Sequence, residues 1–140
     1  MRPLFIISFL LIAVCELSFG QNRKLTDDEL NNSTVTKLKF ADTITCAEID
    51  GWLKSDIKNH TIFLFLQGGI APVIYSEDSI FENKYGVYFY DFGCISPDYK
   101  CVIKYNERVF EYLTNTYSKR WKKKLRKDII EFSQWKAKLK

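Results

Sequence analysis

The sequence predicts a single α+β domain, or a small three-layer α/β domain, with about three strands, about four helices and a helical C-terminus. Apolar residues switch along the chain between the three-to-four spacing of helices and the short continuous runs of buried strands. The expected order is helix, strand, strand, helix, strand, helix, helix, which is typical of mixed architectures. The charged content of 27% and the aromatic content of 16% exclude a disordered or fibrous chain.

The first part of the domain is expected to hold one helix and two strands. Residues 46–58 are predicted to be helical, because their apolar side chains recur on one helical face. Residues 61–67 are apolar at nearly every position, which predicts a strand covered on both faces. Gly68-Gly69 then predicts a tight hairpin into residues 70–75, where Pro72 favours an edge strand because it lacks a ladder donor.

A short helix, a third strand and a long helix are expected next. Ser76 is a candidate cap for the short helix, which ends at Gly86. Residues 87–92 form the third strand. The run Ser96-Pro97-Asp98 combines a cap, a proline at the first helical position and an acid in the first turn, which predicts the start of the long helix. Its apolar stripe continues to Tyr117.

Residues 118–140 are predicted to form a basic amphipathic helical segment. Its large apolar residues are spaced so that all of them lie on one narrow helical face. They are Trp121, Leu125, Phe132, Trp135 and Leu139. Asp128 falls in the middle of this face, so the helix is expected to bend or restart there.

The same segment carries ten basic and two acidic residues. Its basic cluster consists of Lys119, Arg120, Lys122, Lys123, Lys124, Arg126 and Lys127. Two interpretations stay open. These side chains form the solvated face of a packed helix, or they bind an anionic surface such as phospholipid, a glycolipid or an acidic polysaccharide. Export would remove nucleic acid as the usual target of such a cluster.

The N-terminus has the layout of a secretory signal peptide over residues 1–20. A basic start precedes an apolar run that is too short to span a bilayer, and small residues predict cleavage after Gly20. Lipid attachment at Cys15 and an uncleaved anchor are the alternatives. Residues 21–41 are polar and mixed in charge, and we expect them to be a mobile leader ahead of a domain over 42–140. A secreted or periplasmic protein is therefore predicted.

Cys94 and Cys101 are predicted to form a disulfide, because only a short turn separates them and export leads to an oxidising compartment. Cys46 would then be a buried thiol that acts as a small apolar residue. An intermolecular bridge or a reactive thiol is the alternative for Cys46. With Cys94 and Cys101 paired, a four-ligand structural site would have to recruit carboxylates beside Cys46 and the single histidine, His60, so neither a metal nor a cofactor is expected.

Paired carboxylates are the remaining route to catalysis, because the sequence has no phosphate-binding loop and a single histidine. Asp91 interrupts an apolar strand, and Glu82 is a second candidate carboxylate. Two acids flanking a cleft would make a small hydrolase acting on an envelope polymer. A structural role is favoured for Asp91, which is expected to accept hydrogen bonds from turn amides near Gly93 and Cys94.

The run Phe81-Glu82-Asn83-Lys84-Tyr85-Gly86, followed by Tyr90-Asp91-Phe92-Gly93-Cys94, resembles a bacterial family named for its Phe-Glu-Lys-Lys-Tyr (FEKKY) motif. The resemblance covers about residues 46–135, and Asn83 departs from the motif at a position where an exposed helical residue is tolerated. It implies a small exported or lipid-attached bacterial protein with one domain. The family has no assigned activity or ligand, so the resemblance implies no site residue.

The leading hypothesis is a non-enzymatic exported domain that acts as a binding or structural module of the bacterial envelope. The alternatives are a small hydrolase with Asp91 and Glu82 in a cleft, and a cationic-helix binder of anionic membrane surfaces. An envelope protein, a glycolipid or an anionic membrane surface is the expected partner.

Overall fold

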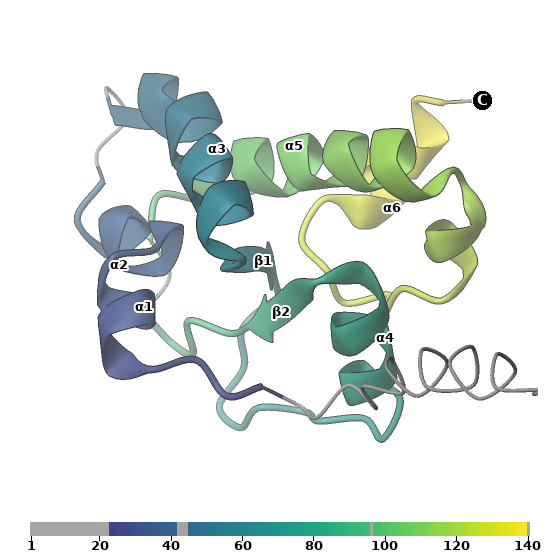
Figure 1. Cartoon of the computed structure of the whole chain (residues 1–140), viewed down its shortest axis with the longest axis horizontal. Helices are drawn as coiled ribbons and strands as arrows, with labels where there is room; N and C mark the ends of the chain where they lie inside the picture. The colour runs from purple at the N-terminus through teal and green to yellow at the C-terminus, as the bar shows by residue number, and fades with distance from the viewer. Residues whose placement is uncertain (1–22, 42–44, 96, 140) are drawn as a thin grey trace, which may run out of the picture.

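The computed structural model describes residues 23–41, 45–95 and 97–139, and it has a mixed α and β fold (Figure 1). The α+β class is confirmed, with two strands and six α-helices in the described part where about three and four were expected. The elements are α1 (Asp27–Asn31), α2 (Thr34–Lys39), η1 (Thr45–Glu48), α3 (Ile49–Asn59), β1 (Ile62–Phe65), α4 (Asp78–Tyr85), β2 (Val87–Tyr90), α5 (Tyr99–Tyr117), η2 (Arg120–Lys123) and α6 (Phe132–Ala137). The signal peptide expected over residues 1–20 lies outside the described residues and stays a prediction.

Two short helices occupy the segment that was expected to be a mobile leader, and that expectation is wrong for residues 23–41. Thr26 caps α1 in a capping box: its side chain accepts a hydrogen bond from the Glu29 N–H, and the Glu29 carboxylate accepts one from the Thr26 N–H. In α2, Val35 and Leu38 are fully buried in the core. Their three-residue spacing is one helical turn, so the folded domain begins before residue 42.

The two strands pair in parallel, with Ile62 opposite Val87 and Phe65 opposite Tyr90. All four residues of β1 are buried, as its continuous apolar run predicted. A parallel pair needs a crossover, and α4 supplies it. The hairpin and edge strand expected over residues 68–75 are therefore wrong, and this stretch is an exposed loop.

The second edge of β1 is closed by α5 and by a C-terminal segment. Leu66 and Ile129 form an antiparallel bridge, and Ile130 donates its N–H to the Phe65 carbonyl at 3.1 Å. The Asn106 side chain accepts from the Phe65 N–H at 2.9 Å and donates to the carbonyls of Phe65 and Ile130 at 3.0 Å each. Asn106 therefore takes the place of a neighbouring strand, which leaves no free edge on β1 for residues 70–75.

A buried polar pair joins α3 to α5. Tyr105 donates its hydroxyl hydrogen to Asp56 at 2.6 Å, and Asp56 also accepts from the Thr34 N–H at 3.3 Å.

The helix α5 is capped by Asp98, which accepts from the Lys100 N–H at 2.8 Å. Ser96, which was expected to be the cap, lies outside the described residues.

The C-terminal segment, expected to be helical with a bend or restart at Asp128, is helical only in part. It consists of η2, an irregular stretch and α6, so the chain restarts as a helix after Asp128 as expected. Ser118 ends α5 with φ 63° and ψ −155°, which turns the chain sharply. Four residues of the expected apolar stripe are buried nevertheless, and they are Trp121, Leu125, Phe132 and Trp135. Leu139, the fifth, is exposed.

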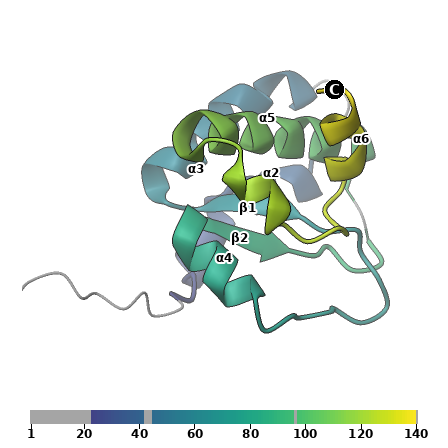
Figure 2. The ribbon, with the colours of Figure 1, turned by 90° about the vertical axis from the view of Figure 1, so that its right-hand side faces the viewer.

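Phe110 of α5 receives this C-terminal segment in an aromatic cluster. Its ring centroid lies 5.9 Å from Trp121, 5.4 Å from Phe132 and 5.0 Å from Trp135. Figure 2 shows the segment lying against α5. The apolar stripe is therefore part of the core.

The disulfide joins Cys46 of η1 to Cys101 of α5, with Cα atoms 5.1 Å apart. The pairing of Cys94 with Cys101 is wrong, because Cys101 is fully buried on the side of α5 next to η1 whereas Cys94 is an exposed free thiol. The expectation that Cys46 is an unpaired thiol is wrong for the same reason. A structural disulfide is typical of proteins outside the reducing cytoplasm.

Among the described residues, no helix combines the length and apolarity that crossing a membrane requires.

Ligand atoms of Cys46, Asp98 and Cys101 lie within 4.8 Å of one another. The two sulfur atoms are bonded to each other, so neither is a thiolate ligand.

Candidate functional site

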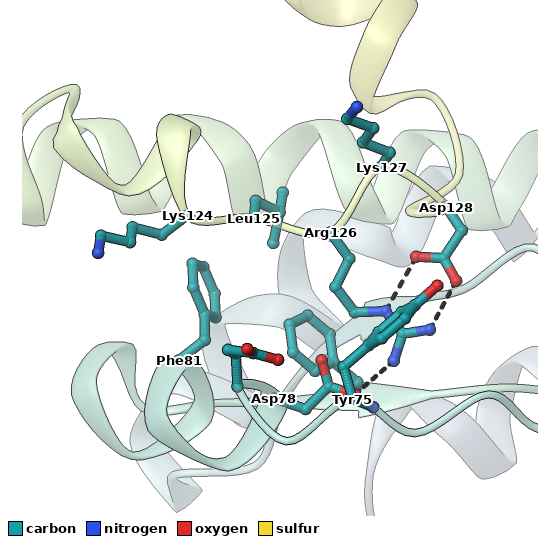
Figure 3. A pocket seen from close by; sticks show the side chains of 10 residues that line it. Tyr75, Asp78, Phe81, Lys124, Leu125, Arg126, Lys127 and Asp128 are labelled. Atoms are coloured by element: carbon teal, nitrogen blue, oxygen red, sulfur yellow. Dashed lines mark hydrogen bonds and ion pairs between the residues drawn. The ribbon is translucent and has the colours of Figure 1, made fainter.

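Arg126 lies at the centre of a hollow of about 350 Å³ between α4 and residues 124–128 (Figure 3). Its guanidinium binds Asp128 through two bonds, of 2.9 Å from Nε and 2.6 Å from Nη2, and Asp78 through Nη1 at 2.6 Å. The ring of Tyr75 lies 4.7 Å from the guanidinium carbon, and that of Phe89 lies 5.4 Å from it. This arrangement ties residues 124–128 to the start of α4.

These contacts change the role expected for Arg126. Its side chain is only 6% exposed, so it is a buried ion-pair partner, and its place in an exposed anion-binding cluster is wrong. The hydrogen bond to Asp128 raises the pKa of Arg126, and the same bond lowers the pKa of Asp128. Both groups are therefore ionised across the physiological range.

Glu82 and Asp91, the two candidate catalytic residues, line one hollow of about 600 Å³ beside the outer edge of β2. Glu82 accepts a hydrogen bond from the Phe89 N–H at 2.8 Å. Asp91 accepts one from the Gly93 N–H at 2.7 Å, so its expected role in a turn is confirmed. Each carboxylate uses one oxygen in these bonds, which leaves its second oxygen for other partners.

Burial raises the pKa of Glu82, and the negative charge of nearby Asp78 raises it further. The hydrogen bond from the Phe89 N–H acts in the opposite direction and lowers this pKa.

The turn beside Asp91 is tightly packed against Gly68. A Cβ atom at Gly68 would lie 2.5 Å from the Gly93 carbonyl oxygen and 2.9 Å from Asp91 Oδ1. Gly68 therefore sets the position of Asp91 in the hollow.

A third hollow, of about 470 Å³, lies between the C-terminal end of α5, η2 and α6. Lys119, Lys122 and Lys136 line it together with Trp135 and one acid, Glu111. The Lys122 Nζ lies 4.5 Å from the centre of the Trp135 ring. Burial lowers the pKa of Lys122, and the charges of Lys119 and Lys136 lower it further. Three cations and one carboxylate thus line one concave site.

These lysines belong to a larger basic surface, which we define as Lys119, Arg120, Lys122, Lys123, Lys124, Lys127 and Lys136. All seven are exposed or half-buried, and none forms an ion pair with an acid in the described part of the chain. Nearby acids are engaged elsewhere: Glu111 binds Arg108 at 2.9 Å, and Glu107 binds Lys138 at 3.1 Å. The surface therefore carries uncompensated positive charge.

The sequence predicted six of these seven residues and missed Lys136. Lys136 joins the basic surface only because α6 folds back onto α5. The sequence also missed the partners of Arg126. Asp78 is 48 residues away along the chain, and no local pattern links the two.

No protein-family model, curated protein or solved structure matches this chain.

Proposed function

We propose that this protein is a non-enzymatic exported domain that binds an anionic component of the bacterial envelope through its basic surface. The observation that carries the proposal is the group of seven cationic side chains without acidic partners in the described structure. Three of them surround the hollow at Trp135, where burial and then the charges of Lys119 and Lys136 lower the pKa of Lys122. A bound anion would offset the repulsion among these three cations.

The mode of binding is electrostatic at this surface. An amphipathic helix would need a free apolar face to lie in a membrane, and Trp121, Leu125 and Trp135 are buried in the core instead. The cationic-helix hypothesis is therefore replaced by a folded basic surface.

Export is supported by two features. The layout of residues 1–20 predicts a secretory signal, with lipid attachment at Cys15 as the alternative. The Cys46–Cys101 disulfide fits an oxidising compartment. The bacterial setting rests on the resemblance to the FEKKY family, and the periplasm or the outside of the cell is the proposed location.

The test is cosedimentation with anionic vesicles, and titration with soluble polyphosphate, both at low salt. The variant K122Q/K123Q/K124Q should bind about 100-fold more weakly, because each lysine near an anionic surface contributes about 1 kcal/mol. The control K39Q/K54Q/K58Q removes the same net charge from exposed lysines of α2 and α3, and it should change affinity by no more than about twofold. Equal losses in both variants, or no binding by the wild type, would contradict the proposal.

A second candidate function is hydrolysis of an envelope polymer, favoured because Glu82 and Asp91 line the same hollow. The raised pKa of Glu82 suits a proton donor, and Asp91 would act as the base or nucleophile. Release of reducing ends from cell-wall polysaccharide should be lost in E82Q and D91N and retained in E77Q, which removes an exposed acid beside the hollow. A wild-type protein that releases none would eliminate this function.

A further inference from the structure

The segment between β1 and α4 is an exposed apolar loop, which we define as residues 67–77. Every residue in it is exposed. Ile70 is 98% exposed and Ile74 is 83% exposed, and Val73 and Tyr75 are exposed as well. Figures 1 and 2 both show the loop running along the lower edge of the molecule, away from α3 and α5. None of these side chains contributes to the core.

The loop combines several features of a contact surface. Its eight residues from Gly68 to Tyr75 are uncharged, and four of them are large apolar or aromatic residues. Apolar residues exposed singly are ordinary, but a contiguous group marks a site of interaction. Phe40, which is 84% exposed, is an example of the single kind in this protein.

The apolar loop adjoins the basic surface. Tyr75, at the end of the loop, lines the hollow of Figure 3 together with Lys124 and Lys127. Its ring stacks on the Arg126 guanidinium at 4.7 Å, which fixes the base of the loop against residues 124–128. The end of the apolar loop and two lysines of the basic surface therefore border the same hollow.

Helix α4 extends the same face. Exposed Ile80 and Lys84 line a further hollow with Lys124. Two acids on this side are engaged within the protein: Asp78 binds Arg126, and Glu82 accepts from the Phe89 N–H. Four acids border this side of the face and equal its four cations in number: Glu77, Asp78, Glu82 and Asp128 against Lys84, Lys124, Arg126 and Lys127. The net positive charge of the face therefore comes from Lys119, Arg120, Lys122 and Lys123 of the basic surface.

We infer that this face docks on an anionic lipid bilayer, with Ile70, Val73 and Ile74 inserted among the acyl chains and the lysines of the face against the phosphate groups. The inference rests on the proposed function and names lipid as its anionic component. Charge complementarity favours the bilayer, and so does continuity of the apolar loop with the basic surface. A soluble acidic polymer would use the lysines and leave the isoleucines in water.

The test compares vesicles of phosphatidylglycerol and phosphatidylcholine in equal parts with soluble polyphosphate. The variant I70S/I74S should bind the vesicles at least about tenfold more weakly, because two buried isoleucines are lost from the contact. Its affinity for polyphosphate should be unchanged. The control F40S removes a comparably exposed apolar residue outside the loop and should bind vesicles as the wild type does. All three side chains are exposed, so unchanged thermal unfolding verifies that both variants fold.

A second readout follows insertion directly. In I70W, the new indole should be quenched by brominated acyl chains, whereas in F40W it should not. The inference would be overturned if I70S/I74S bound vesicles as tightly as the wild type, or if the indole of I70W were not quenched. Binding of polyphosphate by the wild type would still support the proposed function in that case. Loss of all binding in the wild type would overturn both.

Discussion

Replacing Cys46 and Cys101 together by alanine tests the disulfide that holds η1 to the start of α5. The two cysteines are 55 residues apart, and closing a loop of that length removes enough entropy from the unfolded chain to stabilise the fold by about 4 kcal/mol. The closest alternative, Cys94 with Cys101, would close a loop of about eight residues and contribute only about 2.5 kcal/mol. For a domain of this size, 4 kcal/mol corresponds to a drop of about 15 °C in Tm.

The assay combines thermal and urea unfolding, followed by circular dichroism, with alkylation and mass mapping. Before reduction, Cys94 should be alkylated and Cys46 should not, because Cys94 is the exposed free thiol. The matched control is C94A, which should change the free energy of unfolding by less than about 0.5 kcal/mol, as expected for an exposed side chain. Alkylation of Cys46 without reduction, or a loss of stability in C94A as large as in the double variant, would refute the assigned pairing.

Three further predictions concern stability. Asn106→Ala should lower the free energy of unfolding, measured in urea, by about 3 kcal/mol. The reason is that the Phe65 N–H loses its acceptor and the Ile130 carbonyl loses a donor in the core. A loss below about 1 kcal/mol would contradict this reasoning. Ser118→Gly should raise Tm through a gain of about 1 kcal/mol, because glycine relieves the strain at φ 63° and loses part of that gain to unfolded-state entropy; an unchanged or lower Tm would count against it. Burial raises the pKa of Asp56 above its ordinary 3.8, so its contribution to stability is full below that pH and is lost as pH rises through the folded-state pKa. The stability of the wild type relative to D56N, measured in urea from about pH 4 to neutral, should therefore fall as pH rises, and a flat difference would contradict the reasoning.

Local patterns were sufficient for most regular elements. The buried strand β1 lies inside the predicted run 61–67, and α3 overlaps the predicted helix 46–58 over most of its length. The helix α5 ends at Tyr117 as expected. Such elements are set by apolar spacing and by caps within a few residues, so the sequence shows them directly.

Predictions that depended on contacts between distant parts of the chain were right in some cases and wrong in others. Cys101 pairs with Cys46 across 55 residues and not with nearby Cys94. The exposed loop is not a strand, because Asn106 and residues 128–130 already close that side of β1. Glu82 and Asp91, by contrast, do line one hollow beside β2.

Charge shows the same division. Counting residues was enough to locate a basic C-terminal segment, but burial decided which of its cations face solvent. The Arg126 side chain is buried and forms ion pairs with Asp78 and Asp128, whereas its neighbours Lys124 and Lys127 are exposed. A residue's type and spacing are local properties, but its partners depend on which distant segments the core brings together, and these contacts leave no signature in the local sequence.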